Sequence, residues 1–234
     1  MSKYDLGIIG GMGSMATAEL FKRIISRTEY KCDQDHMKIC VLNNSIIPDR
    51  TNCIINNGES PVPYINESIR DLVNLGVDSF IIPCNTAHYF ANQFDINGIR
   101  FISMIEETLL KITEKYKNKK VCILATYGTI KSKVYHNHKL SSNIDFVYAN
   151  EEEQKKVMDV ILYTKSDLHI NENGKTLDEV MKAITEREGN CLFVLACTEL
   201  SLYLNYLYAK HQVIDAMDCL VEAAILKNGY KIKE

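Results

Sequence analysis

The sequence predicts an α/β protein of two pseudo-twofold-related lobes, each a parallel β-sheet covered by helices, with the active site in the cleft between them. Two observations lead to this fold. Short apolar, β-branched runs alternate with longer segments of helical periodicity, which is typical of parallel sheets with covering helices. The two halves are also similar, because in each a strand runs into a loop of small residues and a later strand ends in a cysteine. We expect a first lobe over 1–118, a second over 119–210 and a C-terminal segment, 211–234, that returns to the first lobe.

Apolar spacing and end signals predict the individual elements. In the first half, Ile65, Ile69 and Leu72 recur at helical spacing, and Gly76 is the residue type that most often follows a helix. In the second half, Asn150 is expected to cap a helix whose solvated acidic first turn suits the helix dipole. The expected strands cover 6–10, 38–42, 79–82, 100–102, 121–125, 145–148 and 191–195, and the expected helices cover 15–28, 63–75, 105–116, 151–163 and 177–187.

Length and composition are those of a globular protein with a sizeable core. Of the 234 residues, 46% are apolar and 24% are charged. The formal charge of −3 argues against nucleic-acid binding, and the longest apolar runs fall far short of the roughly 18–20 residues that span a bilayer. The N-terminal segment lacks a secretory pattern, so we expect a cytoplasmic protein. Among the eight cysteines there is no Cys-x-x-Cys pair of the kind that binds zinc.

Two segments carry most of the chemical information. They are 81–88, Ile-Ile-Pro-Cys-Asn-Thr-Ala-His, and 194–200, Val-Leu-Ala-Cys-Thr-Glu-Leu. The apolar run of each is predicted to be a buried strand with a cysteine at its carboxyl end, at the edge of the sheet where ligands bind in open α/β folds. The first amides of a following helix can lower the pKa of such a thiol. Two thiols from similar halves are suited to act as acid and base on opposite faces of one substrate, whereas the alternative is a pair of buried core cysteines.

A glycine loop supports a competing interpretation. Segment 11–16, Gly-Met-Gly-Ser-Met-Ala, matches the dinucleotide-binding pattern and would indicate an NAD-dependent enzyme. That pattern also requires an acidic residue after the second strand, where this chain has Asn43 and Asn44. We therefore favour a tight turn that lets the backbone approach a small carboxylate. A turn that needs glycine only for its dihedral angles remains the alternative.

Together, four segments resemble the aspartate/glutamate racemase family. They are 7–13, Gly-Ile-Ile-Gly-Gly-Met-Gly, then 83–88 and 197–200 around the cysteines, and 125–129, Ala-Thr-Tyr-Gly-Thr. The resemblance runs nearly end to end, and the Gly-Gly-Met-Gly motif is similar to the aspartate racemase branch. It implies a homodimer and racemisation by two cysteines without cofactor or metal. The chain has Ala196 where the family usually has glycine and Ser14 where proline is common, and neither change removes a reacting group.

The resemblance also assigns roles to individual residues. Cys84 and Cys197 would be the catalytic pair, with Cys197 taking the α-proton from the L-enantiomer and Cys84 from the D-enantiomer. Arg50 and Lys165 match basic positions that could hold the side-chain carboxylate of aspartate or glutamate. Glu199 would orient the Cys197 proton or the substrate ammonium, or serve as a capping partner. The expected substrate-binding residues are Met12, Arg50, Asn85, Thr86, Thr126, Thr129, Lys165, Thr198 and Glu199.

Other functions remain open at this point. Maleate isomerases and arylmalonate decarboxylases share the scaffold, and a silent amino-acid-binding module would use the same cleft without needing two thiols. Both cysteines together with Arg50 and Lys165 favour racemisation of a dicarboxylate. His88 is expected to be a satisfied surface histidine, and the alternating histidines His136 and His138 have no neighbouring ligands that would indicate a metal site.

Overall fold

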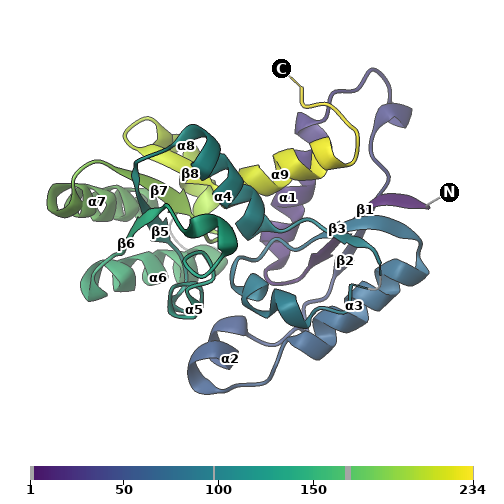
Figure 1. Cartoon of the computed structure of the whole chain (residues 1–234), viewed down its shortest axis with the longest axis horizontal. Helices are drawn as coiled ribbons and strands as arrows, with labels where there is room; N and C mark the ends of the chain where they lie inside the picture. The colour runs from purple at the N-terminus through teal and green to yellow at the C-terminus, as the bar shows by residue number, and fades with distance from the viewer. Residues whose placement is uncertain (1–2, 97, 167–169, 234) are drawn as a thin grey trace.

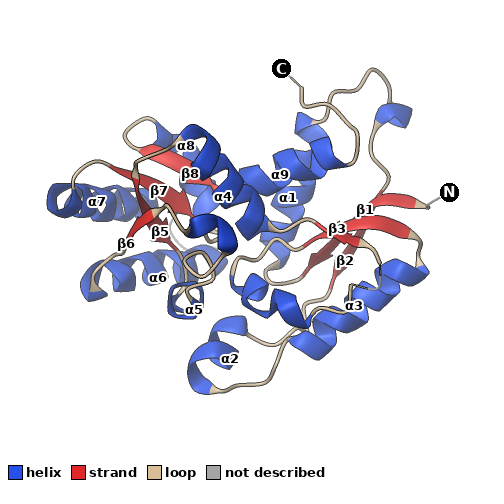
Figure 2. Ribbon diagram, in the orientation of Figure 1, coloured by secondary structure: helices blue, strands red, loops and turns tan. Residues whose placement is uncertain are grey.

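The computed structural model describes residues 3–96, 98–166 and 170–233, and in it two four-stranded parallel sheets lie side by side (Figures 1 and 2). The strand order is β2-β1-β3-β4 in the first sheet and β6-β5-β7-β8 in the second. Both sheets are flanked by helices, so the predicted two-lobed α/β fold is confirmed. The same order in both halves is what a duplicated unit produces.

The elements have the following bounds. The first half contains β1 (Tyr4–Gly10), α1 (Ser14–Arg27), β2 (Ile39–Asn43), α2 (Arg50–Asn56), α3 (Val62–Asn74), β3 (Val77–Ile81), β4 (Arg100–Phe101) and α4 (Met104–Lys115). The second half contains β5 (Lys120–Leu124), α5 (Tyr127–Ser132), β6 (Asp145–Val147), α6 (Glu151–Lys165), α7 (Ile170–Glu188), β7 (Cys191–Leu195), α8 (Leu204–Tyr208), β8 (Gln212–Asp215) and α9 (Ala216–Lys227). Short 3₁₀ helices, Thr86–Gln93 and Leu200–Tyr203, follow the two cysteine segments.

Each half of the chain lends a helix to the sheet of the other half. Helix α9 packs with α1 on one face of the first sheet, and α3 covers the opposite face. Helix α4 packs on the second sheet, whose other face is covered by α6 and α7. The expected boundaries therefore differ from the packing. Helix α4 lies within 1–118 but packs on the second sheet, and β8 lies beyond residue 210 but pairs with β7.

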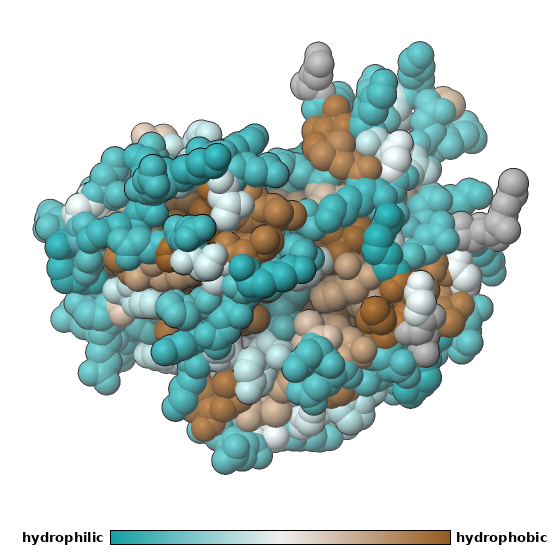
Figure 3. All heavy atoms as spheres, in the orientation of Figure 1, coloured by the Kyte–Doolittle hydropathy of each residue, from teal (hydrophilic) through white to brown (hydrophobic). Residues whose placement is uncertain are grey.

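The lobes meet through polar as well as apolar contacts. On the face shown in Figure 3, hydrophilic residues cover the outer parts of both lobes, and apolar side chains come to the surface toward the middle. Arg23 of α1 reaches the second half, where it forms ion pairs with Asp215 and Asp218 at 2.7 Å. It also donates to the Ser201 carbonyl oxygen. A largely buried charge cluster thus ties the first lobe to the segment that follows Cys197.

Several local predictions can be compared directly with the structure. Gly76 has a φ of +72° and follows Leu75, the C-cap of α3, as expected for a glycine that ends a helix. Asn150 caps α6 as expected. Glu153 in the first turn is buried rather than solvated, and its carboxylate accepts from the backbone N–H of Asn150. Helix α7 begins seven residues before the expected start at Leu177. Gly174 hides this first part of the helix in the sequence, since glycine is unfavourable inside a helix, and a Cβ there would lie 3.3 Å from the Tyr206 ring.

The glycine loop after β1 is shaped by a close approach to the main chain. Gly11 has a φ of +91°, and a Cβ there would lie 2.3 Å from the Asn44 carbonyl group. Its amide donates to the Thr17 hydroxyl at 3.1 Å. Strand β2 ends at Asn43, so no acidic residue stands where a dinucleotide ribose would need one. Gly11 is therefore required by the turn itself and by its packing.

Candidate active site

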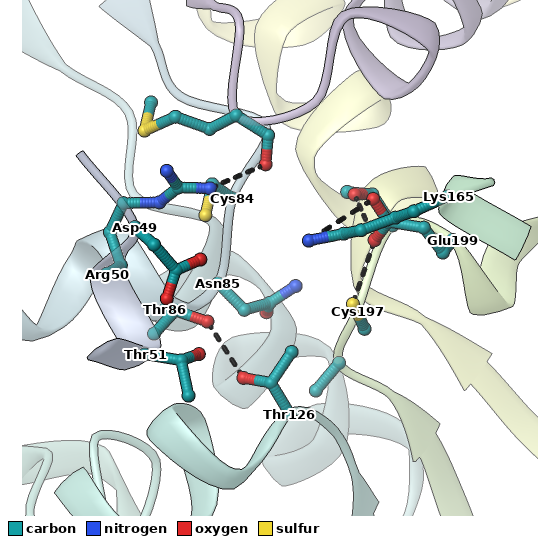
Figure 4. A pocket seen from close by; sticks show the side chains of 13 residues that line it. Asp49, Arg50, Thr51, Cys84, Asn85, Thr86, Thr126, Lys165, Cys197 and Glu199 are labelled. Atoms are coloured by element: carbon teal, nitrogen blue, oxygen red, sulfur yellow. Dashed lines mark hydrogen bonds and ion pairs between the residues drawn. The ribbon is translucent and has the colours of Figure 1, made fainter. Parts of the chain in front are cut away.

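A small cavity lies where the carboxyl ends of β3 and β7 face each other (Figure 4). Its volume of about 20 Å³ is close to that of one water molecule. The lining residues come from both lobes and are Met12, Asp49, Arg50, Thr51, Cys84, Asn85, Thr86, Thr126, Lys165, Ala196, Cys197, Thr198 and Glu199.

The two cysteines occupy equivalent positions in the two lobes. Cys84 follows β3, and Cys197 follows β7, the strand with the same place in the second sheet. Each residue is 7% exposed. Figure 4 shows them on opposite sides of the site, with Asn85 between them. Duplicated topology therefore brings the two thiols to one cavity, although they lie far apart in the sequence.

Cys197 is held by a neighbouring carboxylate. Its Sγ donates to Glu199 Oε2 at 2.9 Å, and the Thr198 hydroxyl donates to the same oxygen at 3.2 Å. Burial, followed by the Glu199 charge, raises the pKa of the Cys197 thiol well above its ordinary value. Glu199 makes no capping hydrogen bond to the short helix that it precedes. In this structure Glu199 therefore fixes the proton of Cys197.

Two cations approach the cavity from opposite lobes. Lys165, at the end of α6, lies with its Nζ 3.9 Å from Glu199 Oε1. Burial is the largest single effect on the pKa of Lys165 and lowers it, but Glu199, Cys197 and Cys84 together outweigh burial, so the pKa is raised and the ammonium stays charged. Arg50 is 8% exposed and donates to the carbonyl oxygens of Met12, at 3.0 Å, and Pro48, at 2.9 Å. Its buried Nε has no acceptor among the described residues.

Three threonine hydroxyls join the lobes below the cysteines. Thr86 Oγ1 lies 3.0 Å from Thr126 Oγ1 and 2.9 Å from Thr129 Oγ1. Thr126 also caps α5 by accepting from the Thr129 amide. Thr86 and Thr126 line the cavity, whereas Thr129 is bonded to both of them but is not among the lining residues. All the other residues predicted from the sequence to bind substrate do line it.

His88 is satisfied, as expected, but it is not at the surface. The ring is 4% exposed, and its Nε2 accepts from the Met104 amide at 3.0 Å. Its Nδ1 must then carry the hydrogen, which it donates to the Cys84 carbonyl oxygen at 2.8 Å. Burial lowers the pKa of His88 to about 4. The prediction of a surface position was wrong because the partner on α4 comes 16 residues later in the chain.

Sequence analysis did not find Asp49, Thr51 or Tyr135. Asp49 and Thr51 line the cavity because they flank Arg50 at the start of α2, where Asp49 accepts from the Asn52 amide. That capping pattern was a readable signal for the helix. Tyr135 donates to Asn85 Oδ1 at 2.6 Å from the other lobe, a contact that no local pattern could indicate.

The described part of the chain contains neither a candidate metal site nor a membrane-spanning helix. No group of three or more histidine, cysteine or acidic residues there is arranged to hold a metal ion. No described helix is both long and apolar enough to cross a membrane.

The two parallel α/β lobes with a cavity between them match the two-lobed racemase fold. The chain belongs to the Asp/Glu/hydantoin racemase family, whose family model matches residues 9–224.

Relatives of known structure and sequence agree with this assignment. An aspartate racemase from Picrophilus torridus is 31% identical and superposes with a TM-score of 0.84, over 98% of this chain and 96% of that one. The broad specificity amino-acid racemase RacX of Bacillus subtilis is 26% identical over 94% of this chain and 96% of its own length. A glutamate racemase from Francisella tularensis, solved in complex with D-glutamate, shares the fold with a TM-score of 0.70 at 14% identity, over 100% of this chain and 85% of its own.

Proposed function

We propose that the protein interconverts L- and D-aspartate by a two-thiol mechanism that uses no cofactor. The observation that carries this proposal is the pair Cys84 and Cys197, on opposite sides of one cavity with Arg50 and Lys165 beside it. Racemisation removes the α-proton from one face and delivers a proton to the other. A thiolate on one side and a thiol on the other perform both transfers and exchange their protonation states in doing so.

The hydrogen bonds of Cys197 suit its part in this exchange. Its raised pKa keeps it a thiol at rest, ready to deliver a proton once Cys84 has removed one. In the opposite direction Cys197 must be the thiolate. The first transfer leaves this state behind, with Cys84 as the thiol, and Sγ regains its hydrogen bond to the Glu199 carboxylate once it has taken the α-proton.

Both carboxylates of aspartate have matching donors in the cavity. Asn85, Thr86 and Thr198 follow the cysteines and suit the α-carboxylate, on which negative charge grows when the α-proton leaves. Arg50 and Lys165 suit the side-chain carboxylate as a charge-assisted pair. The family relationship to an aspartate racemase at 31% identity supports the same substrate.

Chiral separation of products tests this function. We expect the chelator-treated protein, free of pyridoxal phosphate, to convert L-aspartate to D-aspartate and the reverse. Cys219→Ser is the control for substitution of a cysteine outside the cavity. Cys219 is buried elsewhere, on α9, so this variant should convert aspartate like the wild type. Absence of conversion for both aspartate and glutamate, or activity only after a metal or pyridoxal phosphate is added, would contradict the proposal.

A second candidate is racemisation of a wider set of amino acids. A groove of about 840 Å³ adjoins the cavity and shares Arg50, Lys165 and Glu199 with it. Its walls include the apolar side chains of Met15 and Leu202. The name of the Bacillus subtilis relative also points to broad specificity. Conversion of L-methionine or L-leucine at a rate comparable to that of aspartate would favour this candidate.

A further inference from the structure

The amide of Asn85 carries an unused hydrogen-bond donor inside the candidate active site. Its Nδ2 is buried, and no described residue accepts a hydrogen bond from it. The side chain as a whole is 3% exposed and lines the cavity. Figure 4 shows the nitrogen end directed toward the side on which Cys197 lies. A buried donor without a partner is costly and rare in folded proteins, which indicates that a ligand satisfies it.

The other end of the same amide is fixed. Tyr135, from the segment after α5 in the second lobe, donates its hydroxyl to Asn85 Oδ1 at 2.6 Å. The Tyr135 ring is 3% exposed and packs in the apolar cluster between α4 and the second sheet. Because burial raises the pKa of Tyr135, its hydroxyl keeps its proton and remains a donor. An amide that faces a donor must present its oxygen there, so the NH₂ group points the other way.

We propose that Tyr135 is a positioning residue, which orients the Asn85 amide so that Nδ2 donates to the α-carboxylate of the substrate. The inference rests on the proposed racemase function. Without the tyrosine hydroxyl the amide can turn over, and its oxygen would then face the substrate anion. Since Asn85 and Tyr135 belong to different lobes, the donor is oriented only while the lobes are in contact.

A double-mutant cycle on ligand binding tests the proposal. Succinate is the probe, because it is a dicarboxylate that cannot racemise, and calorimetry gives its Kd. We expect Tyr135→Phe to weaken binding at least about tenfold, as for the loss of a hydrogen bond to a charged group. In an Asn85→Ala background the same substitution should change Kd less than about twofold, because the residue through which it acts is gone.

Two further variants complete the test. Tyr230→Phe removes a tyrosine hydroxyl that donates to Asp5 at 2.9 Å. Neither residue lines the cavity, so this variant should bind succinate like the wild type. Asn85→Asp keeps an acceptor for Tyr135 but replaces the NH₂ donor with a carboxylate oxygen. It should bind succinate more weakly than Asn85→Ala, which tests whether the side chain at position 85 donates to the ligand carboxylate even if Tyr135→Phe fails to fold.

The outcomes separate this inference from the proposed function. Unchanged binding by Tyr135→Phe, an equal loss in both backgrounds, or binding by Asn85→Asp at least as tight as by Asn85→Ala would each overturn the inference. Failure of the wild-type protein to racemise aspartate while it still binds succinate would overturn the proposed function instead.

Discussion

His88 should make the stability of this protein depend on pH in a specific range. Its pKa falls from 6.5 in the unfolded chain to about 4 in the folded protein. Protonation is disfavoured because the ring is buried and its Nε2 already accepts from the Met104 amide, at the positive end of the α4 dipole. Below pH 6.5 the unfolded state therefore binds more protons than the folded state, and the free energy of unfolding decreases as the pH falls.

The size of the effect follows from the shift. One pKa unit corresponds to about 1.4 kcal/mol, so the change from 6.5 to about 4 corresponds to about 3 kcal/mol when complete. By pH 5 about 2 kcal/mol of this should already be lost. The contribution of neutral His88 is thus fully present above about pH 7 and absent below about pH 4.

Urea unfolding of the wild type and His88→Gln, followed by circular dichroism from pH 8 to pH 5 with a reductant present, measures the effect. Glutamine can donate to the Cys84 carbonyl oxygen and accept from the Met104 amide, but it does not titrate. The difference between the two free energies of unfolding at pH 8 gives the packing cost of the substitution. We expect the wild type to lose about 2 kcal/mol more than the variant between pH 8 and pH 5. If the free energy of unfolding fell equally in the wild type and the variant between pH 8 and pH 5, the assignment of this pH dependence to His88 would be refuted.

Three further predictions concern the reaction. Cys84→Ser and Cys197→Ser should each abolish racemisation, yet either variant can exchange the α-proton of one enantiomer with deuterated water, which NMR detects. Inversion by either variant would contradict the assignment of the two cysteines as a catalytic pair. Neutral replacement of Arg50 or Lys165 should lower kcat/KM for aspartate at least about tenfold, since a charge-assisted hydrogen bond is lost. Unchanged kinetics in both variants would show that the side-chain carboxylate of the substrate binds elsewhere. Glu199→Gln removes a charge that raises the pKa of Cys197, so the limb of the pH–rate profile that reports this thiol should move to lower pH. A limb that stays in place or moves to higher pH would show that Glu199 does not raise the pKa of Cys197.

The repeated pattern of strand and cysteine made the fold predictable from sequence. Strands β3 and β7 are largely apolar and end shortly before their cysteine, so the edge that carries the site was readable without a structure. Helix α2 was not expected, because its seven residues are too few to display a period. The packing of α4 on the second sheet was also out of reach, since an apolar helix face does not reveal which sheet it covers, whereas the C-terminal segment that contains α9 was expected to return to the first lobe.

The cavity shows the same division between local and distant information. Asn85 and Thr198 could be proposed from their position next to the cysteines. The hydrogen bond from Tyr135 joins residues 50 positions apart, and that from the Met104 amide to His88 joins residues 16 apart. Such pairs depend on how the lobes dock, which no motif encodes.

The exchange of α4 and α9 makes the first lobe depend on a helix that is synthesised long after the strands it covers. Until residues 216–227 have left the ribosome, α1 alone lies over the face of the first sheet that α9 later shares. Leu6, Ile8 and Ile81 on that face are completely buried in the finished protein. A nascent chain that carries the whole first half therefore still exposes part of its core to water. Truncation after Asp215 should leave a chain that aggregates rather than a smaller stable domain.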